Sequence, residues 1–490
     1  MKNSLLKNGF YNTVAGAVRI GLAVLTIPIL IRLIGVEEYG LWTLASSVVA
    51  LVALAEAGLS TATTVFVSQD LAKEDVDGLS QTLTVTFTGM LILATLAAII
   101  LYIVANSLVD FFPKLQLEQR LAVVKALQLA ALVVWARLLQ QVVFGVEQAY
   151  QKYAVMNLLV MLQSLLSNLG SLIVAWLGGR TVELMQCQVV INFLVLAAHI
   201  SVIWLLVRDV KLRLRWSRSK GFAIARYSII TWLATLGGAL FTQADRLIVG
   251  GLLGTNVLGV YAAITNITSQ INIFSALPVQ PLLPAISSQI AVKQDIDQVV
   301  LQGQVKQALQ INSLVALGMG AILCTFAPAI LRLMLGGEIS DQTVLAFYIA
   351  IVIYALYSVN AVGFYILFGV NAVNICMAVQ LFSGINSLFL IAVGANSFGL
   401  IGAILGNAGY LGIWLLTYFG MKKLHIYTPL WLGWIKFPLV WFFVIFLTSI
   451  TNINQALLKV FILTIQILIL FVWFILAQPN YFKLLIQNND

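Results

Sequence analysis

Residues 81–104 read QTLTVTFTGMLILATLAAIILYIV, a run of 24 positions without an ionised side chain. A helix rises about 1.5 Å per residue, so this run is long enough to cross the roughly 30 Å hydrocarbon core of a bilayer. Similar apolar stretches recur on both sides of it, about fourteen in all. The predicted spans are 13–34, 41–66, 81–104, 121–144, 154–177, 184–207, 227–249, 258–283, 308–331, 343–368, 374–395, 399–421, 437–451 and 458–477.

The composition points to the same class of protein. Hydrophobic residues make up 61% of the 490 positions and charged residues 9%, whereas roughly a quarter of a soluble domain is charged. The net charge of +9 does not favour nucleic-acid binding, because the basic residues fall in loops between apolar spans. Cys187, Cys324 and Cys376 lie singly in different spans, without the spacing of a metal site. The sequence therefore predicts an all-α polytopic membrane protein, and we expect no metal and no cofactor.

The distribution of lysine and arginine predicts the orientation. With the N-terminus inside, 17 of these residues lie in cytoplasmic segments and four lie in the opposite loops. The positive-inside rule therefore places the N-terminus in the cytoplasm, and an even number of spans returns the C-terminus to the same side. Residues 208–226 hold seven of the 17. This basic loop could attract an anionic lipid or a pyrophosphate headgroup, but a topology anchor that joins two halves is the favoured interpretation.

Two stretches about six spans apart resemble each other. Gly35 and Gly40 are followed by Leu41-Trp42, and Gly254 and Gly259 are followed by Val260-Tyr261. An even number of spans between the copies predicts a parallel repeat, and such halves typically enclose a central site. The predicted organisation is an N-terminal six-helix bundle at 1–207, a basic cytoplasmic linker at 208–226, a C-terminal six-helix bundle at 227–421, and two further helices with a short cytoplasmic tail at 422–490. The two six-helix bundles are expected to surround a central cavity.

Ionised residues inside apolar spans are the first candidates for function, because a charge in the hydrocarbon core is costly unless it faces a cavity or a partner. Arg19 and Arg137 lie in the cytoplasmic halves of their spans, where snorkelling to the interface is the alternative to a site. Glu56 lies near the middle of the second span, as a partner of Arg19 or as a proton or sodium site. Asp245 and Arg246 lie in the seventh span, where a structural ion pair is the alternative to a binding role.

Proline residues mark helices that we expect to bend. Proline removes a backbone donor and clashes with the preceding turn. Pro28 lies in the first span, and Pro278, Pro281 and Pro284 crowd the end of the eighth. Bent helices suit a moving transporter, although proline is also common in membrane helices that have no such role.

Two stretches resemble a known family. IPILIRLIGVEEYGLW at 27–42 and ADRLIVG at 244–250 are similar to signatures of Wzx-type polysaccharide flippases, and so are the glycines and Tyr261 that follow the second stretch. That family belongs to the superfamily that also holds multidrug and toxin extruders and lipid II flippases. The resemblance covers roughly residues 5–480. It implies two six-helix bundles around a central cavity with two extra C-terminal helices, and translocation of undecaprenyl-pyrophosphate-linked oligosaccharides by alternating access.

This activity needs a cationic path for an anionic headgroup, and arginine suits phosphate because it stays charged and donates in a bidentate fork. Arg19, Arg137 and Arg246 are therefore the predicted substrate-binding residues, with Glu56 and Asp245 as ion-coupling groups or charge partners. The alternatives are a cation-coupled multidrug exporter or a lipid II flippase of the same superfamily. A membrane-embedded polymerase or ligase is less favoured, because the longest outer loop is only about 16 residues.

The expected partners follow from the resemblance. They are the lipid-linked oligosaccharide, membrane lipids, and the polysaccharide polymerase and glycosyltransferases of the same pathway; nucleic acid is not expected. No phosphate-binding glycine loop is recognisable, so H⁺ or Na⁺ coupling or the membrane potential is the expected energy source. The expected location is the bacterial inner membrane. We expect a transporter for surface polysaccharide biosynthesis and not an enzyme.

Overall fold

The protein is helical throughout the part of the chain that the structure describes. The computed structural model describes residues 25–56, 58–208, 210, 213–280, 282–283, 286, 298–336, 339–370, 372–451, 464, 468–470 and 472–473. These residues form helices and short connections, with no strand among them. A helix suits the bilayer because its backbone N–H and C=O groups are hydrogen-bonded within the same segment. A peptide group without a hydrogen bond costs several kcal/mol in lipid.

Ten helical stretches of the described chain are long and apolar enough to cross a membrane. The predicted class, an all-α polytopic membrane protein, is therefore confirmed. The difference from about fourteen predicted spans has identifiable sources. The stretch Val373–Lys423 contains two of the predicted spans, and the predicted span 227–249 lies within a helix that is not among the ten. The spans 13–34 and 458–477 fall largely outside the described residues.

The chain divides into two compact units, Met1–Ala263 and Ile264–Asp490. The first unit holds the short helix Leu25–Ile34, α2 (Val36–Val52), the 3-10 turn η1 (Ala53–Glu56), α3 (Leu59–Ala72), α4 (Val76–Asp110), α5 (Leu117–Ala149), α6 (Tyr153–Trp176), α7 (Thr181–Val207), α8 (Arg218–Leu253) and the start of α9 (Thr255–Ala276). The predicted bundle boundaries at 1–207 and 227–421 stay a prediction.

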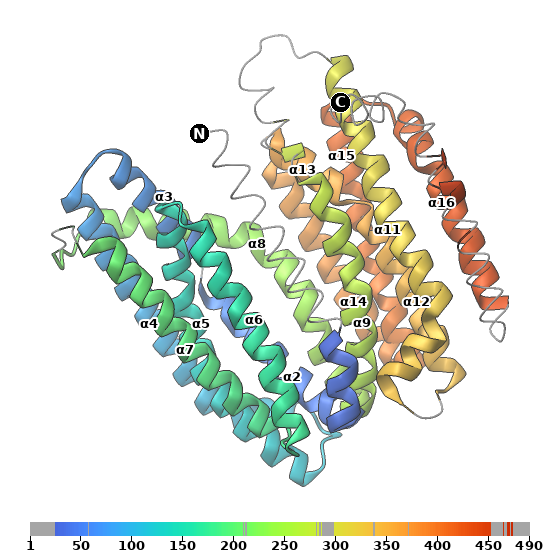
Figure 1. The fold of residues 1–490 in the computed structure, drawn as a ribbon, viewed down its shortest axis with the longest axis horizontal. Coiled ribbons are helices and arrows are strands. Elements are labelled where there is room, and N and C mark those ends of the chain that lie inside the picture. Colours follow the sequence, from blue (N-terminus) through green and yellow to red (C-terminus); the bar gives the residue numbers. More distant parts are fainter. Residues whose placement is uncertain are drawn as a thin grey trace, which may run out of the picture. The chain divides into compact units, whose positions relative to one another are not determined.

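Helix α5 is the centre of the first unit. It packs against α2, α3, α4 and α7, and Figure 1 shows α4, α5 and α7 as long helices that run side by side. Small and branched side chains make this packing possible, and Ala126, Ala130, Val134, Leu138 and Val142 are all fully buried. Close packing of small residues drives helix association in membranes, because lipid tails are as apolar as leucine.

The second unit holds the remainder of α9, the 3-10 turn η2 (Leu277–Val279), α11 (Gln298–Leu335), α12 (Asp341–Ser358), α13 (Ala361–Gly369), α14 (Val373–Gly406), the 3-10 segment η3 (Asn407–Ile413), α15 (Trp414–Lys423) and α16 (Thr428–Thr451). Helix α11 packs on α12 and α16, and α12 packs on α14. Gly399 interrupts α14 with a positive φ of 60°, which separates the predicted spans 374–395 and 399–421. A Cβ atom on Gly402 would overlap the carbonyl oxygen of Gly394, so the chain folds back on itself there.

Aromatic residues of α12 pack inside the second unit. The ring of Tyr357 lies 5.2 Å from that of Tyr410 and 6.1 Å from that of Tyr354, measured between centroids. Asn360, just beyond α12, accepts a 2.8 Å hydrogen bond from the hydroxyl of Thr417. Tyr354, Tyr410 and Asn360 are buried, so these contacts stabilise the helix bundle of this unit.

Candidate functional site

The repeated glycine motif starts a helix in both copies. Gly35 precedes α2 with a φ of 85°, and Gly254 precedes α9 with a φ of 88°. Residues with a side chain avoid this left-handed region, so glycine at these two positions is a backbone requirement. The matched conformation supports the repeat that the sequence predicts.

The second glycine of each copy lies where α2 and α9 cross. A Cβ atom on Gly40 would overlap the carbonyl oxygen of Thr255, and a Cβ atom on Gly259 would overlap the carbonyl oxygen of Val36. The two overlaps are reciprocal, because Val36 and Thr255 occupy the same place in the two copies. The repeated motif therefore packs against its own copy, with backbone against backbone.

The two glutamates between the glycines of the first copy bind neighbouring helices. Glu37 accepts a 2.6 Å hydrogen bond from the side chain of Gln119 in the first turn of α5. Glu38 accepts a 2.8 Å hydrogen bond from the backbone N–H of Thr181, the first residue of α7. A carboxylate at a helix N-terminus satisfies an unpaired N–H and complements the helix dipole. This motif thus joins α2 to α5, α7 and α9.

Glu56 lies at a break in the second predicted span. The helix changes to a 3-10 turn at Ala53–Glu56, and α3 begins only after Gly58, which has a φ of 72°. The indole N–H of Trp232 in α8 donates a 2.7 Å hydrogen bond to the carbonyl of Leu54, which the break leaves available. Glu56 Oε2 is buried and has no hydrogen-bond partner among the described residues. Non-helical backbone at membrane depth is tolerated where it lies in protein or lines a water-filled cavity.

Arg137 lies within a partly buried polar cluster formed by Arg137, Gln140, Gln163, Gln188 and Asn192. Its Nε donates to the side-chain oxygen of Asn192 at 3.2 Å, and Gln163 donates to the same oxygen at 3.0 Å. Gln140 donates to the carbonyl of Asn192 at 2.9 Å, and Asn192 donates to the carbonyl of Gln188 at 2.7 Å.

The other residues of this cluster are neutral. Within the described chain, no carboxylate forms an ion pair with Arg137, and its Nε donates to the amide oxygen of Asn192. Such a guanidinium keeps donors for an anion in a helix bundle that otherwise excludes charge.

Asp245 is hydrogen-bonded to a residue of the second motif copy. Its side chain is buried and accepts a 2.9 Å hydrogen bond from the hydroxyl of Tyr261, which follows Gly259 in the second copy. Arg246 follows it in α8 and is half-buried. No hydrogen bond or ion pair among the described residues joins Arg137 to Glu56, and the substrate-binding and coupling roles of these residues stay predictions.

The structure describes some of the remaining predicted residues. Pro28 lies within the helix Leu25–Ile34, and Pro278 lies in η2, where α9 gives way to a 3-10 turn. Arg19, Pro281 and Pro284 lie outside the described residues.

The sequence interpretation missed a buried pair between α5 and α7. His199 Nδ1 lies 2.8 Å from Glu147 Oε1, both side chains are fully buried, and the ring of Phe144 packs edge-on against His199 at 4.8 Å. Glu147 Oε2 and His199 Nε2 have no partner among the described residues. The predicted span 121–144 ends before Glu147, whereas α5 continues to Ala149. A glutamate one turn beyond an apolar run, with a histidine inside another, is the signal that could have revealed the pair.

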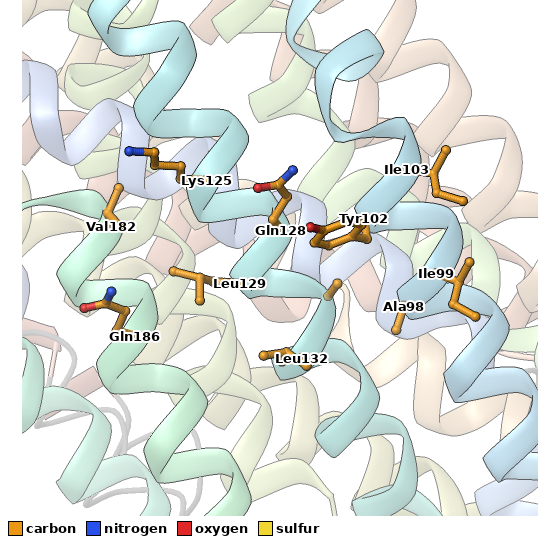
Figure 2. A pocket seen from close by; sticks show the side chains of 11 residues that line it. Ala98, Ile99, Tyr102, Ile103, Lys125, Gln128, Leu129, Leu132, Val182 and Gln186 are labelled. Carbon is orange, nitrogen blue, oxygen red and sulfur yellow. The ribbon is translucent and has the colours of Figure 1, made fainter.

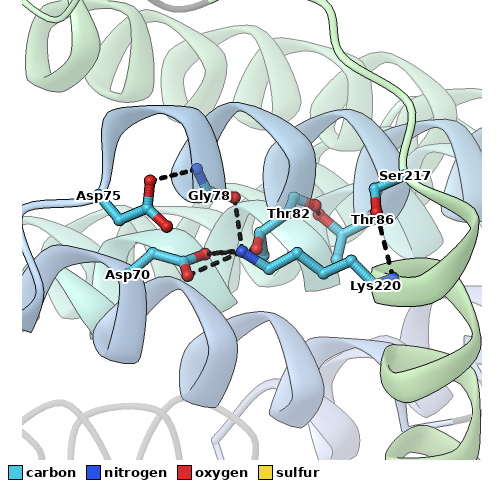
Figure 3. A network of polar contacts seen from close by, with 7 residues as sticks. All are labelled: Asp70, Asp75, Gly78, Thr82, Thr86, Ser217 and Lys220. Atoms are coloured by element: carbon cyan, nitrogen blue, oxygen red, sulfur yellow. Dashed lines mark hydrogen bonds and ion pairs between the residues drawn. The ribbon is translucent and has the colours of Figure 1, made fainter.

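Lys220, near the end of the basic loop 208–226, binds residues of α3 and α4. Lys220 Nζ lies 2.8 Å from both carboxylate oxygens of Asp70 and donates to the carbonyl of Gly78 at 2.7 Å (Figure 3). Asp70 also accepts a hydrogen bond from the hydroxyl of Thr82. Ser217, the N-cap of α8, accepts from the backbone N–H of Lys220. The interpretation of the loop as a topology anchor stays a prediction, and α8 begins at Arg218, inside the predicted linker.

We compared the chain with protein-family models, curated protein sequences and solved structures. The family model described as "Polysaccharide biosynthesis protein" matches residues 5–290, more than half of the chain. We found no curated protein sequence with significant similarity to the chain.

Several solved structures share the fold. The structure of the lipid II flippase MurJ in an inward closed conformation covers 97% of this chain and 100% of its own, with a TM-score of 0.74 at 14% identity. An inward-facing MATE family multidrug resistance transporter of the MOP superfamily covers 84% of this chain and 98% of its own, with a TM-score of 0.68 at 15% identity. A MOP superfamily transporter from Pyrococcus furiosus covers 83% of this chain and 95% of its own, with a TM-score of 0.56 at 17% identity. At these identities the likeness shows the fold alone.

Proposed function

Since this chain belongs to the family of polysaccharide biosynthesis proteins, we propose that it is a flippase for undecaprenyl-pyrophosphate-linked oligosaccharides. It carries these units across the bacterial cytoplasmic membrane by alternating access, for the synthesis of a surface polysaccharide. The family match over residues 5–290 is the observation that carries the proposal. The many membrane-spanning helices support it, because the substrate must cross the bilayer.

The chemistry of the first unit is compatible with an anionic headgroup. Arg137 donates to the amide oxygen of Asn192 and is not neutralised by a carboxylate of the described residues, so its charge remains available to a phosphate. The break at Glu56 brings an unpaired carboxylate oxygen and non-helical backbone into the second span. Discontinuous helices of this kind mark binding sites in many transporters. In the proposed mechanism Arg19, Arg137 and Arg246 contact the pyrophosphate, while Glu56 and Asp245 balance charge or bind the coupling ion.

Energy for the cycle comes from an ion gradient or the membrane potential in this proposal. Moving one elementary charge through 100 mV is worth about 2.3 kcal/mol, which is enough to bias a two-state transporter. The polymerase and the glycosyltransferases of the pathway are the proposed functional partners. Both termini lie in the cytoplasm.

A multidrug exporter and a lipid II flippase are the alternative functions, since proteins of both kinds share the fold. An exporter of organic cations needs an acidic site, and the polar cluster around Arg137 does not provide one, because its other members are neutral amides.

Deletion of the gene in the native host tests the proposal. We expect lipid-linked repeat units to accumulate on the cytoplasmic leaflet and surface polysaccharide to be lost, with both restored by the wild-type gene. Unchanged polysaccharide together with increased drug susceptibility would favour the exporter, and arrested peptidoglycan synthesis would favour the lipid II flippase.

A further inference from the structure

A groove runs along the outside of the first unit, with α5 as its floor and α4 and α7 as its walls (Figure 2). Its volume is about 720 Å³. Ala98 and Ala131 present small side chains to the groove. Ile99 and Ile103 on the α4 wall and Leu132 on the floor are exposed, so the groove opens sideways. In a membrane this opening faces lipid.

The groove is polar at one end and apolar at the other. Lys125, Gln128 and Tyr102 lie towards one end, and Leu132 and Ala98 towards the other, as Figure 2 shows. The polar end is near the first residues of α5 and the last residues of α4, which the predicted orientation places at the outer face. From the predicted start of the span at 121, Lys125 is about 6 Å deep and Leu132 about 16 Å deep. The groove therefore follows one leaflet, whose hydrocarbon half is about 15 Å thick.

The positive charge of Lys125 indicates that an anionic headgroup fits the polar end of the groove. Lys125 is the one ionised residue in the lining, its side chain is exposed, and no carboxylate of the described chain forms an ion pair with it. The lining also contains the amides of Gln128 and Gln186, which are hydrogen-bond donors. An ammonium in a lining with amides matches a phosphate ester, and the apolar end matches an acyl chain.

We propose that this groove binds one anionic phospholipid of the outer leaflet, with the phosphate at Lys125 and an acyl chain along Ala98 and Leu132. A membrane phospholipid fits better than the polyprenyl pyrophosphate carrier. A single lysine balances one phosphate charge, whereas a pyrophosphate calls for further cations that the lining does not contain. The site is separate from the polar cluster around Arg137, and the proposal does not depend on the transported substrate.

The experiment is a lipid titration of the purified, delipidated protein in neutral detergent, read by thermal unfolding and by native mass spectrometry. Phosphatidylglycerol is compared with phosphatidylcholine, which has the same chains and no net charge. We expect phosphatidylglycerol to raise the unfolding temperature more than phosphatidylcholine. Lys125→Gln should weaken phosphatidylglycerol binding about fivefold, which corresponds to about 1 kcal/mol for one basic residue at the membrane surface.

Two further variants separate the site from general charge effects. Lys114→Gln removes an exposed lysine in the loop before α5, outside the groove lining, and should leave the preference for phosphatidylglycerol unchanged. Leu132→Trp fills the apolar end and should reduce binding of both lipids.

Three results would overturn the proposal. The first is a Lys125→Gln protein that keeps the full preference for phosphatidylglycerol, and the second is an equal loss in Lys114→Gln. The third is undecaprenyl pyrophosphate binding more tightly than phosphatidylglycerol in a manner that depends on Lys125, which would identify the carrier lipid as the occupant.

Discussion

The crossing of the two motif copies provides the sharpest test of how this fold is held together. Gly40→Ala places a Cβ atom against the carbonyl oxygen of Thr255, and Gly259→Ala places one against the carbonyl oxygen of Val36. Both obstacles are backbone atoms within helices, so no side-chain rotation relieves the overlap. The helices must separate, and this loses the packing of the buried residues beside the crossing, among them Leu44 and Leu258.

The expected cost follows from this geometry. Overpacking a well-packed core typically costs about 1–3 kcal/mol, and a clash with rigid backbone belongs at the upper end. Because one separation of α2 and α9 relieves both overlaps, the double variant should cost less than the sum of the single variants. Gly318→Ala is the matched control, since nothing lies within 4 Å of a Cβ atom added there in α11. Alanine favours a helix by up to about 1 kcal/mol over glycine, so this control should be neutral or stabilising.

Thermal unfolding of the purified variants in detergent measures the effect. We expect Gly40→Ala and Gly259→Ala to unfold several degrees below the wild type, and Gly318→Ala to unfold at or above it. The reasoning would be refuted if Gly40→Ala were as stable as Gly318→Ala, or if the two motif variants were fully additive.

Three further predictions concern the charged groups. Lys220→Met should destabilise the protein by about 3–5 kcal/mol because it leaves the buried carboxylate of Asp70 unpaired, and adding Asp70→Asn should recover most of the loss in the same unfolding assay. Glu147→Ala should lower the unfolding temperature, since it removes the partner of His199 from a fully buried contact; an unchanged temperature would show that the pair contributes little. Arg137→Gln should retain folding, because an amide fits its amide neighbours, but should fail to restore surface polysaccharide in the deletion strain; full restoration would remove Arg137 from the proposed path.

The class of fold was predictable from the sequence because a helix that crosses the hydrocarbon core must be apolar and about 20 residues long. Residues 81–104 lie within the single helix α4, as their hydropathy indicates. The glycine repeat was also recognisable, because a positive φ and a close backbone approach both demand glycine at fixed positions. The break after Val52 was not predicted, since residues 41–66 read as one apolar run and the carbonyl that the break leaves is bonded by Trp232, far away in the sequence.

The polar contacts were harder to predict for the same reason. Asp70 and Lys220 are 150 positions apart, and Glu147 and His199 are 52 apart. Hydropathy marks a charge as unusual but does not say which distant side chain satisfies it. Tyr261 is recognisable in the sequence as part of the motif, but its hydrogen bond to Asp245 is visible only in the structure.

Flipping in a purified system tests the central proposal most directly. The protein would be reconstituted into liposomes with a fluorescent undecaprenyl-pyrophosphate-linked oligosaccharide, and exposure of the sugar to an external, membrane-impermeant reagent would be followed over time. We predict that wild-type protein makes the sugar of the inner leaflet accessible, that Arg137→Gln does so much more slowly, and that the Gly318→Ala control matches the wild type. Equal accessibility with and without the protein, under every imposed ion gradient and membrane potential, would contradict the proposed function.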